Sequence, residues 1–172
     1  MAIMAMSITG CDLDINVDPN SPAKVPNAQL LSSAQVAIFT SFGPNGSGLG
    51  APASIWVHQI MVRSAADGYA STGTDPNINN PWVNLYAGAM TDLETIIQQG
   101  VEGEQYQYVG IAKILKAYSY STMVDMWGDI PFSKALQGAV DPFPIFDNDA
   151  DVYTALFPLI DEAILDLAKP KP

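Results

Sequence analysis

The segment between Gln105 and Pro131 constrains the fold more than any other part of the chain. From Gln105 to Val124 the only charged side chains are Lys113 and Lys116, and residues three apart share one stripe of a helix. Almost every other side chain in this segment is apolar, small or aromatic. A helix with so narrow a polar stripe is usually covered by neighbours on most sides. We therefore predict the central helix of an all-helical layered domain.

The predicted central helix ends in an aromatic corner, Trp127-Gly128-Asp129-Ile130-Pro131. Gly128 suits a left-handed backbone conformation at the helix end, and Pro131 cannot continue a helix. The sequence therefore predicts a sharp change of chain direction at this point.

Four further helices are predicted from the spacing of apolar residues. They run from about Pro26 to Phe42, from about Pro52 to Arg63, from an Asn80 cap with Pro81 in the first turn to Gly100, and along the apolar face from Val152 to Leu167. The helix that ends at Gly100 should form a hairpin with the central helix, through a connector of about five residues. We predict an all-α fold of stacked helical hairpins, tetratricopeptide-like, with long irregular loops.

Acidic and amide side chains precede the last predicted helix. We interpret Asp147, Asn148, Asp149 and Asp151 as its caps and first-turn acids, because carboxylates favour the positive end of a helix dipole. Pro158 should kink this helix, since it removes one main-chain hydrogen bond.

The polar loop 64–79 is long for a compact domain, and a binding role for it is a separate hypothesis.

Composition excludes several classes of function. The 172 residues suffice for one domain with a core, and a charged fraction of only 15% suggests that some apolar surface faces a partner. A net charge of −11 without a basic patch excludes nucleic-acid binding and electrostatic attachment to anionic lipid. A single cysteine excludes an internal disulfide and a Cys-based metal site, and a single histidine excludes a His-based metal site. No apolar run is long enough to span a membrane.

Nothing in the sequence assembles a catalytic centre, and we predict no catalytic residue and no cofactor. Acids such as Asp161, Glu162 and Asp166 are expected at helix ends and on solvent faces rather than as a convergent pair. His58 has no motif-matched nucleophile and is expected to be structural.

The central helix and corner together resemble a family pattern. The form Y-x-x-G-x-A-x-x-L-x-A-Y, running into W-G-D-I-P and then P-F-S-x-A, is similar to the SusD/RagB family of outer-membrane nutrient-binding lipoproteins. The matching residues are Tyr106 or Tyr108, Gly110, Ala112, Leu115, Ala117, Tyr118, the corner, and Phe132 to Ala135. Members of that family are several times longer, so the resemblance covers only their amino-terminal helical part, and the chain is a fragment, a truncated relative or a sequence that continues further.

The amino terminus fits the same resemblance. Ile8-Thr9-Gly10-Cys11 resembles a bacterial lipobox, in which the cysteine is acylated and becomes the first mature residue. The segment C-D-L-D-I-N that follows is similar to the start of SusD-like proteins exported to the surface of Bacteroidetes-type bacteria. We expect a residual signal over 1–11, an extended tether over 12–25 and a SusD-like helical domain over 26–172. A free cysteine in a flexible tail is the alternative, because no basic residue precedes the apolar run.

The resemblance implies a function and partners. A SusD-like lipoprotein sits as a lid on a SusC-like TonB-dependent outer-membrane transporter and captures an oligosaccharide or peptide for import. The alternative is a soluble helical-repeat module for protein–protein interaction. The aromatic side chains of Trp127, Trp56 and Tyr86 are weak candidates for ligand contacts, because their helical spacing favours core packing. Among the tryptophans, Trp127 is expected to be the most exposed, since it lies at a helix end.

Overall fold

The architecture is all-α, as the sequence predicts. The computed structural model describes residues 24–43, 48–60 and 76–170. Its elements are α1 (Asn27–Phe42), α2 (Gly50–Trp56), α3 (Pro76–Val83), the π-helical segment η2 (Asn84–Met90), α4 (Thr91–Glu102), α5 (Tyr106–Trp127), the short 3-10 segment η3 (Gly138–Val140) and α6 (Asp149–Ala168). Within these described residues no strand occurs, and an isolated antiparallel bridge joins Ile130 to Asp147.

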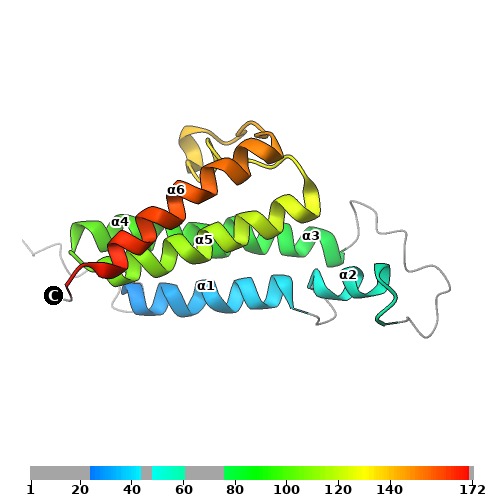
Figure 1. The fold of residues 1–172 in the computed structure, drawn as a ribbon, viewed down its shortest axis with the longest axis horizontal. Helices are drawn as coiled ribbons and strands as arrows, with labels where there is room; N and C mark the ends of the chain where they lie inside the picture. The colour runs from blue at the N-terminus through cyan, green and yellow to red at the C-terminus, as the bar shows by residue number, and fades with distance from the viewer. Residues whose placement is uncertain (1–23, 44–47, 61–75, 171–172) are drawn as a thin grey trace, which may run out of the picture.

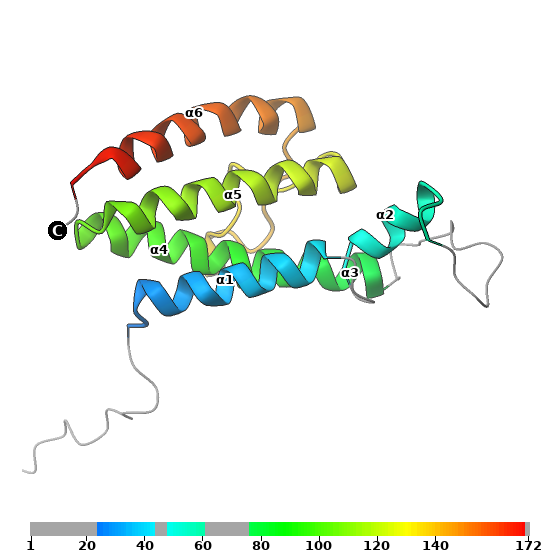
Figure 2. The same ribbon diagram turned by 60° about the horizontal axis from the view of Figure 1, so that its bottom comes forward.

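The long helices lie side by side with alternating chain directions. α1, the rod from α3 to α4, α5 and α6 follow one another in this way in Figure 1. Figure 2 shows α5 between α4 and α6, with α1 on the side of α4. α5 contacts α6, α4 and α1, so it is the central helix that its narrow polar stripe predicts. Helices that pack on their sequence neighbours in this way confirm the tetratricopeptide-like, stacked-hairpin fold class.

The two lysines of α5 reach different neighbouring helices. Lys113 Nζ lies 2.9 Å from Asp166 Oδ2 and 2.8 Å from Glu162 Oε2, both on α6. Lys116 Nζ lies 2.6 Å from Glu94 Oε2 on α4. The expectation that Asp166 faces solvent is wrong, because its side chain is only 10% exposed and takes part in this pairing.

α5 and α6 approach each other most closely beside Gly110. A methyl group on Gly110 would lie 2.6 Å from Leu167 Cγ and 2.9 Å from the carbonyl oxygen of Ala163. Carbon atoms in good contact lie roughly 3.5–4.0 Å apart, so no side chain fits here. The glycine of the Y-x-x-G-x-A pattern is therefore explained by helix packing.

The helical rod before α5 begins earlier and ends later than predicted. The chain is helical from Pro76 to Glu102, so Asn80 is not a cap, Pro81 lies inside α3, and the helix continues past Gly100. Pro76 takes the first helical position, where the missing N–H has no intrahelical partner to lose. The predicted apolar stripe is confirmed, with Leu85, Ala89, Met90, Leu93 and Ile96 fully buried. The connector to α5 is also short, residues 103–105.

α2 is shorter than the helix predicted over 52–63. It ends at Trp56, and His58 then adopts a φ of 57°. The main-chain N–H of Gln59 bonds the carbonyl of Ser54, which closes the helix with a turn. The prediction failed because the helical periodicity of the apolar residues continues beyond the point where the backbone leaves the helix.

α6 begins where predicted but buries only part of its predicted face. The Asn148 side chain accepts a hydrogen bond from the Ala150 amide at 3.2 Å, and Pro158 lies inside the helix. Val152, Leu156 and Ala163 are buried, whereas Ile160, Ile164 and Leu167 are 40%, 57% and 38% exposed. The reason is that α6 packs mainly against a single neighbour, α5.

Candidate functional site

The corner after α5 is formed by a glycine with a positive φ and two buried residues. Gly128 has a φ of 72° and a ψ of −121°, and its amide donates to the Val124 carbonyl at 2.8 Å. The positive φ agrees with the prediction, although this ψ lies outside the left-handed helical region. Ile130 and Pro131 are buried. The chain therefore leaves α5 abruptly and continues as the corner loop, residues 132–147.

Asp147 ties the two ends of the corner loop together. Its Oδ2 accepts hydrogen bonds from the amides of Phe132 at 2.9 Å and Ser133 at 2.8 Å, and its Oδ1 accepts from the Ser133 hydroxyl at 2.6 Å. Burial raises the pKa of this carboxyl, but the hydrogen bonds outweigh burial and hold the pKa below its ordinary value. The prediction that Asp147 caps the last helix is wrong, because Asn148 has that role.

Aromatic rings from three parts of the chain meet beside the corner. The ring centroid of Trp82 lies 4.8 Å from that of Tyr86 and 5.1 Å from that of Trp127. Phe146 of the corner loop stacks on Trp82 at 6.2 Å. The Tyr86 hydroxyl donates to the Pro131 carbonyl at 2.6 Å, and burial raises its pKa far above the ordinary range, so it remains a donor. These contacts attach the corner to the helical rod.

Two adjoining cavities lie between the corner loop and the rod formed by η2 and α4. The apolar cavity has a volume of about 540 Å³, and its walls include Trp82, Tyr86, Pro131, Pro142 and Pro144. The polar cavity has a volume of about 480 Å³, and its walls include Glu94, Gln98, Lys116 and Ser133. Both are lined by residues 135–137, so the turn at these residues separates them.

The three predicted ligand contacts fall in different environments. Tyr86 lines the apolar cavity, and Trp127 packs half-buried against Trp82. Trp56 lies on α2 and is 40% exposed. The expectation that Trp127 would be the most exposed tryptophan is wrong, because the Trp82 indole packs against its ring.

Sequence reasoning missed the turn that lies between the two cavities and the residue that fixes its loop. Leu136, at the turn between them, has a φ of 65°, which is rare for a residue with a side chain. The P-F-S pattern after the corner was the available signal, since Phe132 and Ser133 supply the amides that Asp147 binds. No local pattern indicated that Asp147 would return to them from the far end of the loop.

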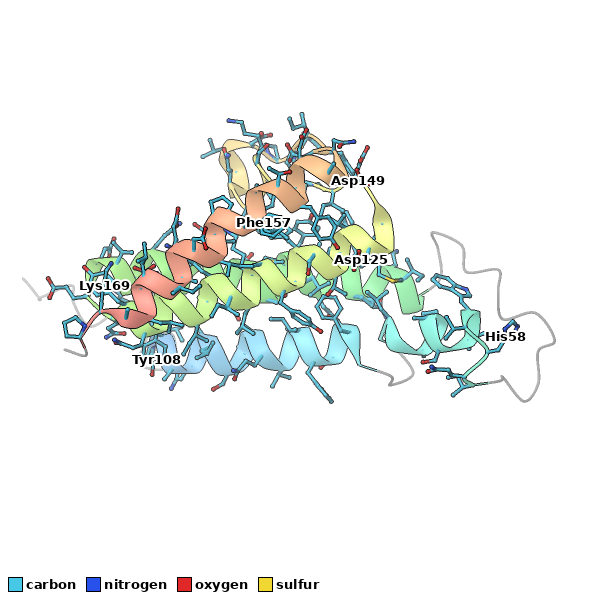
Figure 3. The ribbon with its side chains drawn as sticks, in the orientation of Figure 1. His58, Tyr108, Asp125, Asp149, Phe157 and Lys169 are labelled. Carbon is cyan, nitrogen blue, oxygen red and sulfur yellow. The ribbon has the colours of Figure 1, made fainter. Side chains whose placement is uncertain are left out.

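The His, Cys, Asp and Glu side chains of the described residues do not gather into a metal site. Within the described ranges, no three His, Cys, Asp or Glu side chains come close enough to hold a metal ion. Figure 3 shows His58 beyond α2 and Asp149 at the start of α6, on separate elements.

The carboxyl of Asp166, between α5 and α6, has a shifted pKa. Burial raises the pKa of Asp166, but hydrogen bonds from Lys169 and Lys113 outweigh burial and lower the pKa.

Two predicted features lie outside the described residues. Residues 1–23, which include Cys11, and residues 64–75 of the polar loop are not described, so lipidation and a binding role for that loop stay predictions. The last residues of the predicted loop belong to α3. Among the helices that are described, none is long and apolar enough to cross a membrane.

Comparison with known proteins relates this fold and corner to one family. A solved structure of a SusD/RagB family protein from Bacteroides thetaiotaomicron VPI-5482 matches with a TM-score of 0.68 and 24% sequence identity, over 86% of this chain and 32% of that chain. The chain thus spans about a third (32%) of the length of that protein. No curated protein matches. The SusD-like family model, described as starch-binding associating with outer membrane, matches residues 19–171. Because that match covers most of the chain, this protein belongs to the SusD-like family.

Proposed function

We propose that this chain acts as, or as part of, a substrate-capturing lid on a SusC-type TonB-dependent transporter, for import of glycan or peptide at the outer membrane. The observation that carries the proposal is the family match over residues 19–171, whose description names starch binding and association with the outer membrane. A shared fold would not be enough, because one fold serves many functions. In this role the chain binds its substrate and does not transform it.

Exposed apolar residues support contact with a large partner. Phe39 on α1 is 73% exposed, and Phe157 and Leu165 on α6 are 68% and 67% exposed. Large exposed apolar patches on proteins commonly mark interaction sites. A lid must present one surface to its transporter and another to its cargo, and apolar helix faces are suited to the first.

The proposed anchor is an acyl group on Cys11. The small residues before Cys11 suit lipoprotein processing, and residues 12–25 would then serve as a tether between the membrane and α1. A single hydrocarbon chain gives weak and reversible attachment, so stable anchoring requires at least two acyl chains on the cysteine.

The test is to isolate the native complex from outer membranes and to identify by mass spectrometry the Cys11 modification and the co-purifying proteins. A diacylated or triacylated Cys11 together with a large β-barrel transporter is the expected result. Unmodified Cys11 and no barrel would overturn the proposal and favour a helical adaptor. A Cys11→Ser variant is the matched control, because it removes only the thiol that accepts the lipid.

A further inference from the structure

We infer that a third cavity, at the end of the bundle where α1 begins and α4 ends, binds a free α-amino acid with an apolar side chain. This end cavity has a volume of about 450 Å³ and is lined by residues 24–28, Gln99, Gly103, Gln105 and Tyr108. It shares no lining residue with the two cavities beside the corner loop. The inference goes beyond the proposed function, because a free amino acid is neither a glycan nor a peptide.

Opposite ends of two helix dipoles meet at the end cavity. Figure 1 shows α1 beginning and α4 ending at the same end of the bundle, and the two helices contact each other. The start of a helix carries a partial positive charge and its end a partial negative charge. Neither charge is offset locally, because α1 has no acidic residue in its first turn and α4 has no basic residue in its last turn. The two walls therefore have the polarity of a zwitterion.

Unpaired main-chain groups lie at both walls. The amides of Gln29 and Leu30 bond the Pro26 carbonyl, at 3.0 and 3.2 Å, whereas the amides of Asn27 and Ala28 find no acceptor among the described residues. Such amides at a helix start bind carboxylates. On the α4 side, the carbonyl of Gly103 accepts no main-chain hydrogen bond within the described ranges. A carboxylate thus fits the α1 wall, and an ammonium group fits the α4 wall.

The side chain of Asn27 indicates that the missing ligand carries a hydrogen-bond donor. Asn27 is only 7% exposed, and its Nδ2 donates to Gln105 Oε1 at 2.9 Å. Its Oδ1 is buried and receives no hydrogen bond in the described part of the chain. Buried polar atoms are nearly always paired, so a donor is missing beside this cavity. An ammonium group supplies the donor, whereas a simple anion would be repelled by the unpaired oxygen.

The charged side chains at the mouth have the same polarity as the walls. Lys24 lies before the start of α1 and Glu102 is the last residue of α4. The distance of 3.8 Å between Lys24 Nζ and Glu102 Oε2 exceeds that of a hydrogen bond. Both side chains are largely exposed, at 64% and 73%, so each is accessible to the opposite charge of a zwitterion.

The rest of the lining suits an apolar side chain of the ligand. Val25, Pro26 and Tyr108 contribute aliphatic and aromatic surface. Figure 3 places Tyr108 at the end of the bundle where α1 begins. The volume of 450 Å³ falls inside the range of roughly 300–1,000 Å³ that small-molecule pockets occupy. The cavity therefore has room for the side chain of an amino acid such as leucine or phenylalanine.

The test is isothermal titration calorimetry of the full chain with L-leucine and L-phenylalanine. The matched ligands are the N-acetyl and the amide derivatives, which lack the charged ammonium group and the carboxylate respectively. We expect at least one of the two amino acids to bind. Each blocked derivative of that amino acid should bind at least about tenfold more weakly, because it loses hydrogen bonds to a charged group.

Two substitutions place the ligand in the end cavity. Lys24→Gln removes an exposed charge at the mouth and should raise Kd about two- to fivefold, the effect of one exposed ion pair. Lys134→Gln, at an exposed lysine of the corner loop, makes the same change of net charge and should leave Kd unchanged. Asn27→Leu removes the buried acceptor and should raise Kd at least about tenfold. The blocked ligands and Lys24→Gln test the site whether or not Asn27→Leu folds.

Three outcomes overturn the inference. They are no binding of either amino acid, equally tight binding of a blocked derivative, and binding that Lys24→Gln weakens no more than Lys134→Gln does. Co-purification of a transporter from outer membranes would stand in each case, so failure of this site is distinguishable from failure of the proposed function.

Discussion

Replacing Gly110 by alanine tests whether close approach of α5 and α6 holds the last helix in place. The new methyl group would lie 2.6 Å from Leu167 Cγ, 2.9 Å from Leu167 Cδ2 and 2.9 Å from the Ala163 carbonyl oxygen. The oxygen belongs to the backbone of α6, so a rotamer change cannot relieve that contact. α6 would have to move away from α5, with which it makes most of its contacts.

The expected loss of stability follows from two opposing terms. Overpacking costs about 1–3 kcal/mol, and the upper end applies because backbone must move. Alanine in place of glycine inside a helix returns about 1 kcal/mol. We therefore expect Gly110→Ala to lower the free energy of unfolding by about 2 kcal/mol. Gly88→Ala is the matched control, because a methyl group there meets nothing closer than Ala37 Cβ at 3.9 Å. It should raise stability by up to about 1 kcal/mol.

Urea unfolding followed by circular dichroism measures the stability of both variants. The slope of the free energy of unfolding against urea concentration should be the same in the variants and the natural chain. The two alanine variants should differ by about 3 kcal/mol, or roughly 6–12 °C in melting temperature for a chain of this length. Adding Leu167→Ala to Gly110→Ala should recover part of the loss, since two of the three close atoms belong to Leu167. Equal stability of Gly110→Ala and Gly88→Ala would refute the packing of α6 on α5 described here.

Three further predictions concern the corner and the buried acid. Gly128→Ala should lower the free energy of unfolding by about 1–3 kcal/mol in urea titration, because a φ of 72° with a ψ of −121° is a backbone conformation that residues with a side chain rarely adopt. Asp147→Ala should cost about 1–3 kcal/mol by the same assay, since it leaves the amides of Phe132 and Ser133 without their acceptor. The pKa of Asp166 lies below its ordinary value of 3.8 in the folded chain. The stabilisation of the fold by its carboxylate is therefore fully present above about pH 3.8 and is lost as the pH falls through the pKa of the folded state. The free energy of unfolding should therefore fall more steeply below pH 3.8 in the natural chain than in Asp166→Asn, and parallel profiles would contradict the pairing.

The sequence predicts the elements whose residues interact locally. The apolar stripe of the α3–α4 rod and the positive φ of Gly128 were predicted correctly, because helix periodicity and backbone sterics act within a few residues. Helix starts were predicted less well, since Pro76 and Pro81 both suit a first turn and only the structure distinguishes them. The burial of Asp166 could not be predicted, because its partner Lys113 comes from a helix far earlier in the chain.

The candidate site was predicted only in outline for the same reason. The aromatic corner is local and was recognised, but the cavities beside it are enclosed by a loop that returns to the rod. Asp147 illustrates the difficulty, since a carboxylate just before a helix is most often a cap. Here it binds amides fifteen and fourteen residues earlier, a pairing that no spacing rule identifies.

The motif that relates this chain to its family describes a scaffold more than a ligand site. Gly110 permits helix contact, and Trp127, Gly128 and Pro131 build the corner, so each is required by packing or backbone geometry. Gln98 and Gln137, which line the cavities, lie outside that motif and are exposed, so they can vary without cost to the fold. Substitutions at these two positions should therefore leave the free energy of unfolding unchanged, whereas substitutions in the motif should lower it.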